Sequence, residues 1–139
     1  MNFVNPDDDA LRTLLQTVKT IAVVGLSPQP ARPSYRVAKA MQHYGYRIVP
    51  VRPLVDEVLG EKAYASLADI PFPVDLVDVF RAADHVPAIV SQCLALHLPG
   101  IWIQEGIVHE AAAQQAQAGG MTVVMDRCIL KDYVRLNTE

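Results

Sequence analysis

The sequence predicts an α/β fold, a doubly wound, mostly parallel sheet of about five strands with helices on both faces. Three observations lead to it. Short β-branched runs alternate with helical patterns along the 139 residues, and parallel strands require such crossovers. The strand candidates are apolar on both faces, as in a covered sheet. Apolar residues make up 51% of the chain, enough for one buried core.

We expect a single domain over residues 1–139, with an N-terminal helix within residues 1–19 that packs across one edge of the domain. Asp7 begins a run of three acids, which favour the start of a helix. The apolar residues that follow at helical spacing are Leu11, Leu14, Leu15 and Val18.

The remaining elements alternate in order. Residues 21–24 form a β-branched first strand that ends at Gly25, and Ser34 is a candidate N-cap for a helix that stops at Gly45. The pattern predicts further strands at residues 47–51, 75–80, 101–104 and 122–125, and further helices at 86–94, 110–118 and 129–136.

Composition excludes several classes of partner. The net charge is −3 and the basic residues are scattered, which argues against nucleic acid. The acidic start and the lack of a long apolar run argue against a signal peptide or membrane span, so we expect a cytoplasmic protein.

No pattern predicts a metal centre or a catalytic triad. Cys93 and Cys128 lie far apart outside any zinc motif, so we expect reduced, mostly buried thiols. The four histidines fall in different elements, and no serine lies in a GxSxG elbow.

The loop after the first strand is the best phosphate-site candidate. Gly25, Leu26 and Ser27 follow the strand, where exposed N–H groups can face phosphate. The GxGxxG fingerprint is absent and the loop is proline-rich, which argues against ordinary NAD binding. Arg32 and Ser34 can add donors to phosphate, or they are a solvated arginine and a helix cap.

Arg52 stands at the end of the second strand, where a dinucleotide fold offers an acid to the ribose hydroxyls. An arginine there suits a phosphate on the ribose, which coenzyme A (CoA) carries at its 3′ position and NADP at its 2′ position. The alternative is a surface arginine.

Residues after the later strands add weaker candidates. Phe80 and Arg81 can supply a wall and a cation, or Phe80 is a core residue that ends its strand. Gln104 and Gly106 are better site candidates than Trp102, which is more typical of a core.

Asp126, Arg127 and Cys128 follow the last strand and allow two interpretations. Arg127 can lower the pKa of the neighbouring thiol and make it reactive. Alternatively, Asp126 and Arg127 form a pair that stabilises the end of the strand, and this is the interpretation we favour.

Taken together, six segments resemble the small, single-domain CoA-binding proteins. This Rossmann-like family is similar to the CoA-binding N-terminal domain of the succinyl-CoA synthetase α subunit, and the resemblance spans nearly the whole chain. In order, the segments are IAVVGLS (21–27), RPSY (32–35), PVRP (50–53), VDVFR (77–81), WIQEG (102–106) and MDRC (125–128).

The resemblance implies a ligand site assembled from these segments. The implied pyrophosphate residues are Gly25, Ser27, Arg32 and Ser34, and Leu26 and Tyr35 are further cofactor-binding candidates. The implied adenosine residues are Val51, Arg52, Pro53, Phe80 and Arg81, with Gln104 and Gly106 completing the cleft. The family often has Asn or Ser where this chain has Arg52, which leaves the role of that residue open. The synthetases carry their phosphorylated histidine in a separate domain, so the resemblance implies no catalysis.

We therefore expect a CoA or acyl-CoA binding protein with a non-catalytic or accessory role and a small-molecule nucleotide as its partner. One alternative is an NADP-dependent oxidoreductase, motivated by Arg52. Another is a thiol-based redox or carrier protein that uses Cys128. A homodimer is plausible, although nothing in the sequence requires one.

Overall fold

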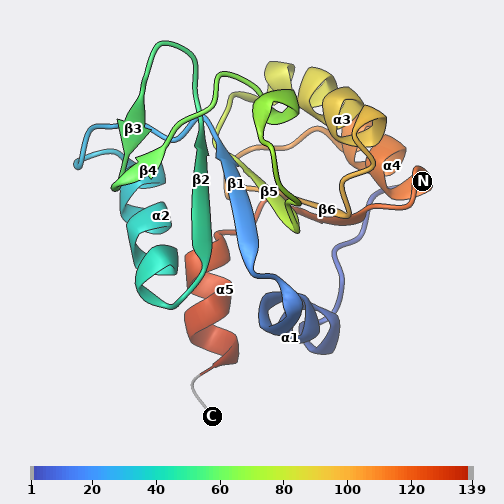
Figure 1. Cartoon of the computed structure of the whole chain (residues 1–139). Helices are drawn as coiled ribbons and strands as arrows, with labels where there is room; N and C mark the ends of the chain where they lie inside the picture. The colour runs from blue at the N-terminus through green and yellow to red at the C-terminus, as the bar shows by residue number, and fades with distance from the viewer. Residues whose placement is uncertain (1, 138–139) are drawn as a thin grey trace.

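The computed structural model describes residues 2–137, and its centre is a five-stranded, wholly parallel sheet (Figure 1). The strand order is β2-β1-β5-β6-β7. The bounds are β1 (Thr20–Val24), β2 (Arg47–Val51), β5 (Leu76–Val79), β6 (Gly100–Ile103) and β7 (Thr122–Met125). The predicted α/β, doubly wound fold is confirmed.

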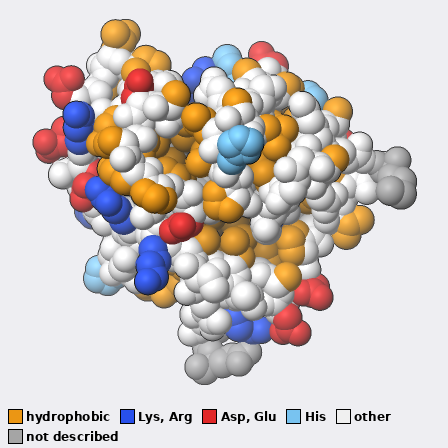
Figure 2. Space-filling model, turned by 45° about the vertical axis from the view of Figure 1, so that its right-hand side comes forward, with side chains coloured by type: hydrophobic (Ala, Val, Ile, Leu, Met, Phe, Trp, Pro, Cys, Tyr) orange, Lys and Arg blue, Asp and Glu red, His pale blue; other side chains and the backbone are white. Residues whose placement is uncertain are grey.

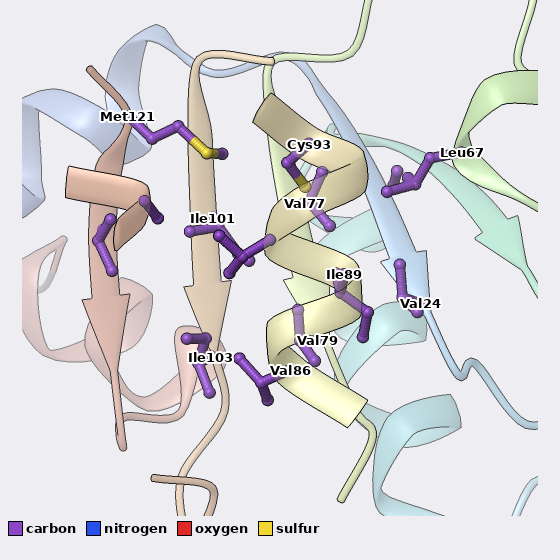
Figure 3. Close-up of a cluster of buried hydrophobic side chains, with 14 of the residues drawn as sticks. Val24, Leu67, Val77, Val79, Val86, Ile89, Cys93, Ile101, Ile103 and Met121 are labelled. Carbon is purple, nitrogen blue, oxygen red and sulfur yellow. The ribbon is translucent and has the colours of Figure 1, made fainter. Parts of the chain in front are cut away.

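Five helices cover the two faces of the sheet. They are α1 (Asp8–Thr17), α2 (Pro33–His43), α3 (Val86–Ala95), α4 (Glu110–Ala118) and α5 (Ile129–Leu136). Helices α3 and α4 share one apolar cluster with the sheet, and α1, α2 and α5 share the other. Figure 3 shows the first cluster, where Val86, Ile89 and Cys93 of α3 point toward the strands. Each strand is therefore buried on both faces, as its apolar sequence predicts.

Helix α1 packs against one face of the sheet. Its buried residues Leu11 and Leu15 belong to the same cluster as Trp102, which is fully buried. Asp7 caps the helix by accepting a hydrogen bond from the Ala10 N–H at 2.9 Å. The helix packs in this position because the sheet and α5 together cover its apolar face.

Two local features differ from the sequence prediction. Asp75 precedes β5 (Leu76–Val79), and its carboxylate accepts hydrogen bonds from the backbone N–H groups of Lys19 and Thr20, both at 3.0 Å. A small antiparallel hairpin, β3 (Glu57–Val58) and β4 (Glu61–Lys62), was not predicted, because strands of two residues carry no periodicity. Leu59 and Gly60 form its turn with φ of 56° and 75°, as in tight hairpins.

The surface with α3 and α4 turned forward carries apolar side chains over its middle and most charged side chains toward its periphery (Figure 2). Within residues 2–137, no helix has the length and apolar character needed to cross a bilayer.

The sheet topology determines where a ligand can bind. From β1 the chain crosses to β2 at one edge and later returns past β1 to β5, so the order reverses between β1 and β5. In open parallel sheets, ligands bind beyond the carboxyl ends of the strands at this point. The segments after β1, β2 and β5 therefore meet at one place.

Candidate functional site

A cavity of about 420 Å³ lies beyond the carboxyl ends of β1 and β5, at the start of α2. We call it the phosphate cavity. It is lined by Gly25, Ser27, Pro28, Gln29, Arg32, Pro33, Ser34, Arg52, Phe80 and Arg81. The structure thus brings together predicted site residues from three separate strand ends.

The charge of this cavity is entirely positive. Its charged lining residues are Arg32, Arg52 and Arg81, and no acid lines it. Within residues 2–137, the guanidinium groups of Arg32 and Arg52 have no hydrogen bond or ion pair, while Arg81 Nη2 lies 3.1 Å from His85 Nε2. Guanidinium groups bind phosphate in a bidentate, charge-assisted manner, so the cavity suits an anionic ligand.

Gly25 allows the strand ends to approach closely. Its φ of +86° is in the left-handed region, and a Cβ there would lie 2.6 Å from the Phe80 carbonyl oxygen and 2.9 Å from Arg81 Cδ. The Gly25 N–H donates to the Val51 carbonyl at 3.0 Å. The missing side chain therefore serves first to admit the segment after β5 against the end of β1.

Ser34 is not the N-cap of α2, so that prediction is wrong. The helix begins at Pro33, Arg32 occupies the N-cap without a side-chain hydrogen bond, and Ser34 lies inside the first turn. Proline suits the first helical position because its φ is fixed and it has no N–H to satisfy. The Ser34 hydroxyl instead accepts a hydrogen bond from the Ser27 N–H at 3.0 Å, which ties the loop to the helix.

The first turn of α2 also supplies backbone donors. The first N–H groups of a helix have no intrahelical partner, and after Pro33 they belong to Ser34 and Tyr35. The Tyr35 side chain packs beside the apolar cluster, and Leu26 is completely buried in it. Neither side chain lines the phosphate cavity, so their assignment to the site stays a prediction and concerns only their backbone groups.

A second cavity of about 400 Å³ adjoins the first. It is lined by Gly25, Val51, Arg52, Pro53 and Arg81, three of which also line the phosphate cavity. Four of the five residues that the resemblance implies around adenosine therefore line one cavity, and the fifth, Phe80, lines the adjoining phosphate cavity.

Gln104 and Gly106 lie outside these cavities. The Gln104 side chain is buried and donates a hydrogen bond from Nε2 to Asp78 Oδ1. The Gly106 N–H donates to Asp126 Oδ1 at 2.7 Å. Burial raises the pKa of Asp78 to about 7, and the Gln104 hydrogen bond opposes this rise. We did not predict a role for Asp78, although an acid within an apolar strand is a visible signal.

The predicted pair between Asp126 and Arg127 is wrong. Arg127 instead forms a bidentate pair with Asp132, at 2.6 and 2.7 Å, because the first turn of α5 brings that carboxylate back to the strand end. These residues line a separate charged cavity of about 240 Å³, which we call the α5 cavity. It is lined by Glu105, Asp126, Arg127, Cys128, Lys131, Asp132 and Arg135.

The two thiols differ in environment. Cys93 is buried, and burial raises the pKa of its thiol to about 12. Cys128 is only half-buried, so the expectation of mostly buried thiols holds for Cys93 alone. The thiol-based alternative rests on Cys128 and stays a prediction.

Comparison with known proteins places the chain in a family. Residues 19–133 match the family model described as a CoA binding domain. The uncharacterized protein YneT of Bacillus subtilis is 46% identical over 125 residues, which cover 90% of this chain and 93% of that protein. A solved Thermus thermophilus structure superimposes with a TM-score of 0.90 at 38% identity, covering 94% of this chain and 99% of that one.

A larger relative contains a similar segment. The α subunit of the ADP-forming acetate–CoA ligase II of Pyrococcus furiosus is 30% identical over 130 residues, covering 84% of this chain but only 28% of that subunit. The match over residues 19–133 and the likeness to YneT lead to one conclusion: the chain belongs to the CoA binding domain family.

Proposed function

We propose that this protein binds CoA or an acyl-CoA in the phosphate cavity and acts as an accessory binding module rather than as a catalyst. The observation that carries the proposal is the set of three arginines without an acid, two of them without a protein partner among residues 2–137. CoA presents a diphosphate and a 3′-phosphate, which call for several cations at one end of the molecule.

The arrangement supports a division of labour among the arginines. Arg32 lies at the start of α2, where free N–H groups and the helix dipole favour a diphosphate. Arg52 lies at the end of β2, where this class of fold contacts the ribose, and suits the 3′-phosphate. Pro53 and the wall beyond Val51 then lie toward the adenosine.

The accessory role is supported by the ligase relative. That protein is an ADP-forming acetate–CoA ligase subunit, and this chain spans 28% of it. A segment of that size corresponds to the family's binding domain. We do not assign the ligase reaction to this chain, because a shared domain does not imply a shared activity.

An NADP-binding function is the second candidate, because Arg52 also suits a ribose 2′-phosphate. The loop from Gly25 to Ser34 contains no GxGxxG fingerprint, which favours CoA over a dinucleotide.

Calorimetry with CoA, acetyl-CoA and NADPH tests the proposal, with native mass spectrometry of protein purified without added ligand. We expect saturable CoA binding that Arg32→Ala weakens about tenfold, since a charge-assisted hydrogen bond contributes roughly 1.5–3 kcal/mol. Arg36→Ala is the matched control, because Arg36 is exposed on the same helix outside the cavity lining. Absence of CoA binding, preference for NADPH, or equal weakening by both variants contradicts the proposal.

Two further expectations belong to this proposal. A cytoplasmic location stays a prediction. A homodimer stays a prediction, and sedimentation velocity across a concentration range tests it.

A further inference from the structure

We propose that His85 positions Arg81 for phosphate binding, and that protonation of its imidazole weakens the binding of the phosphorylated ligand. This inference rests on the proposed function and adds regulation to the same site. It starts from the location of Arg81, which lines both cavities described above and a third of about 180 Å³. The third cavity is lined by Val24, Val51, Pro53, Ala65, Ser66, Leu67, Arg81, His85, Ala88, Ile89 and Gln92.

Arg81 forms the wall between these spaces. Its Cδ lies 2.9 Å from the position that a Cβ would take on Gly25, so its aliphatic part crosses the end of β1. Its guanidinium reaches His85 at the end of the short helix η2 (Ala83–His85). Arg81 Nη2 and His85 Nε2 lie 3.1 Å apart, and within residues 2–137 this is the side-chain hydrogen bond of Arg81.

The chemistry of this contact fixes the state of the imidazole. A guanidinium has five donors and no acceptor, so His85 Nε2 must accept the hydrogen bond and the ring proton must reside on Nδ1. A protonated imidazole has no acceptor left and carries a charge of the same sign as Arg81. Protonation therefore converts an attractive contact into a repulsive one.

Few charges surround the ring. Asp84 Oδ1 lies 3.9 Å from His85 Nε2, and Arg81 Nη2 lies 3.1 Å from the same nitrogen. The other residues lining the third cavity are uncharged. Imidazoles in general change charge between about pH 5 and 8, so a contact that requires an unprotonated ring is a candidate for pH dependence.

The contact benefits binding through preorganisation. Arginine loses rotamer freedom when a ligand fixes it, and a side chain already held by His85 loses less. The guanidinium has further N–H donors that can face the phosphate cavity while Nη2 contacts the imidazole. We therefore expect a held Arg81 to bind phosphate more tightly than a released one.

Calorimetry with CoA from pH 5.5 to 8 on wild type, His85→Ala and His85→Gln tests the inference. The glutamine carbonyl can accept from Arg81 but does not titrate. At pH 8 we expect His85→Ala to weaken CoA binding about tenfold and His85→Gln to stay within about threefold of wild type. Below pH 6 the wild type should lose affinity relative to His85→Gln. The phosphates of CoA also titrate, but they do so in every variant, so the difference between proteins isolates the imidazole.

Two results overturn the inference: equal affinities of wild type and His85→Ala at pH 8, or parallel pH profiles for wild type and His85→Gln. In an Arg81→Ala background, the His85 substitutions should have no further effect, and a persisting effect also overturns it. The contact is tested without ligand by the imidazole ¹⁵N shifts of His85 at pH 8. They should show the proton on Nδ1, and a proton on Nε2 contradicts the contact. If CoA fails to bind while these shifts are as expected, it is the proposed function that fails.

Discussion

Two cavities rich in arginine lie beyond the carboxyl ends of the strands, and they differ in whether their cations have protein partners. In the α5 cavity, the cations have carboxylate partners: Arg127 with Asp132, Arg135 with Asp8 and Asp132, and Lys131 with Glu105. In the phosphate cavity, the guanidinium groups of Arg32 and Arg52 have no protein partner within residues 2–137. The number of cations in a cavity does not distinguish a ligand site from a structural ion-pair network. Whether those cations have carboxylate partners in the protein does.

The largest expected effect concerns a charge that neither cavity contains: Asp78, a buried acid whose hydrogen-bond partner is a neutral amide. Asp78 is 2% exposed, and Gln104 is its hydrogen-bond partner. Burial raises its pKa from 3.8 to about 7, so the folded state holds a proton that the unfolded state has lost between these values. Its contribution to stability is complete below about pH 4 and is lost as the pH rises to about 7, by up to roughly 4 kcal/mol.

Urea denaturation of wild type and Asp78→Asn at pH 4.5, 6 and 7.5 checks this prediction. The variant should lack the part of the pH dependence that Asp78 causes, and it should be the more stable protein at pH 7.5. Parallel curves for the two proteins would show that the carboxyl does not titrate in this way.

Substitutions in the α5 cavity, whose cations have carboxylate partners, should change stability but not CoA binding. Asp132→Ala removes a buried carboxylate and leaves Arg127 without its bidentate partner. Breaking a fully buried pair costs about 3–5 kcal/mol, but the Arg127 side chain is 37% exposed, so we expect about 2 kcal/mol. Thermal and urea unfolding measure the loss, and CoA affinity should not change.

Lys131→Ala is the matched control for that experiment. It breaks an ion pair with Glu105 in which both side chains are well exposed, so it should cost much less stability than Asp132→Ala. Equal costs for the two variants would remove the energetic distinction between the pairs.

Substitutions of the unpaired arginines in the phosphate cavity should change ligand binding but not stability. Arg52→Asn should weaken CoA about tenfold, or about 1.4 kcal/mol, and weaken dephospho-CoA much less, because only CoA carries the 3′-phosphate. Stability should change by less than about 0.5 kcal/mol, since no protein partner within residues 2–137 is lost. Equal weakening of both ligands would place Arg52 elsewhere on the nucleotide.

The smallest effect concerns the serine that shapes the phosphate cavity. Ser34→Ala leaves the N–H of buried Ser27 without its acceptor, which should cost about 1 kcal/mol in urea unfolding. Ser66→Ala is the control, because the Ser66 hydroxyl bonds only to Asp69 at an exposed position. If both variants are equally stable, Ser34 does not hold the loop.

The fold could be predicted because its strands are long enough to show composition. Residues 20–24 and 122–125 are β-branched and buried almost throughout, so their class is visible without neighbours. The hairpin at residues 57–62 escaped notice because each strand has two residues. The position of α1 depends on α5, which the local sequence of α1 does not describe.

The site could be predicted only in part. Arg32, Arg52 and Arg81 follow strands or loops whose order in the sheet brings them together, and that rule is general. The partners of a side chain are not: Asp126 and Arg127 are neighbours in sequence but bind Gly106 and Asp132. Gln104 ends a strand as expected, yet its amide turns to Asp78, an interaction that no sequence spacing indicates.

The ion pair between Asp8 and Arg135 joins residues 127 positions apart, and Arg12 Nε also donates to the Leu136 carbonyl. During translation α1 emerges from the ribosome before α5. Until α5 follows, α1 is little more than an isolated helix of ten residues, which is barely stable in water. Helices α3 and α4, in contrast, pack on strands made just before or after them. During synthesis the two faces of the sheet should therefore mature at different times, and the face that holds α1 stays incomplete until α5 has left the ribosome.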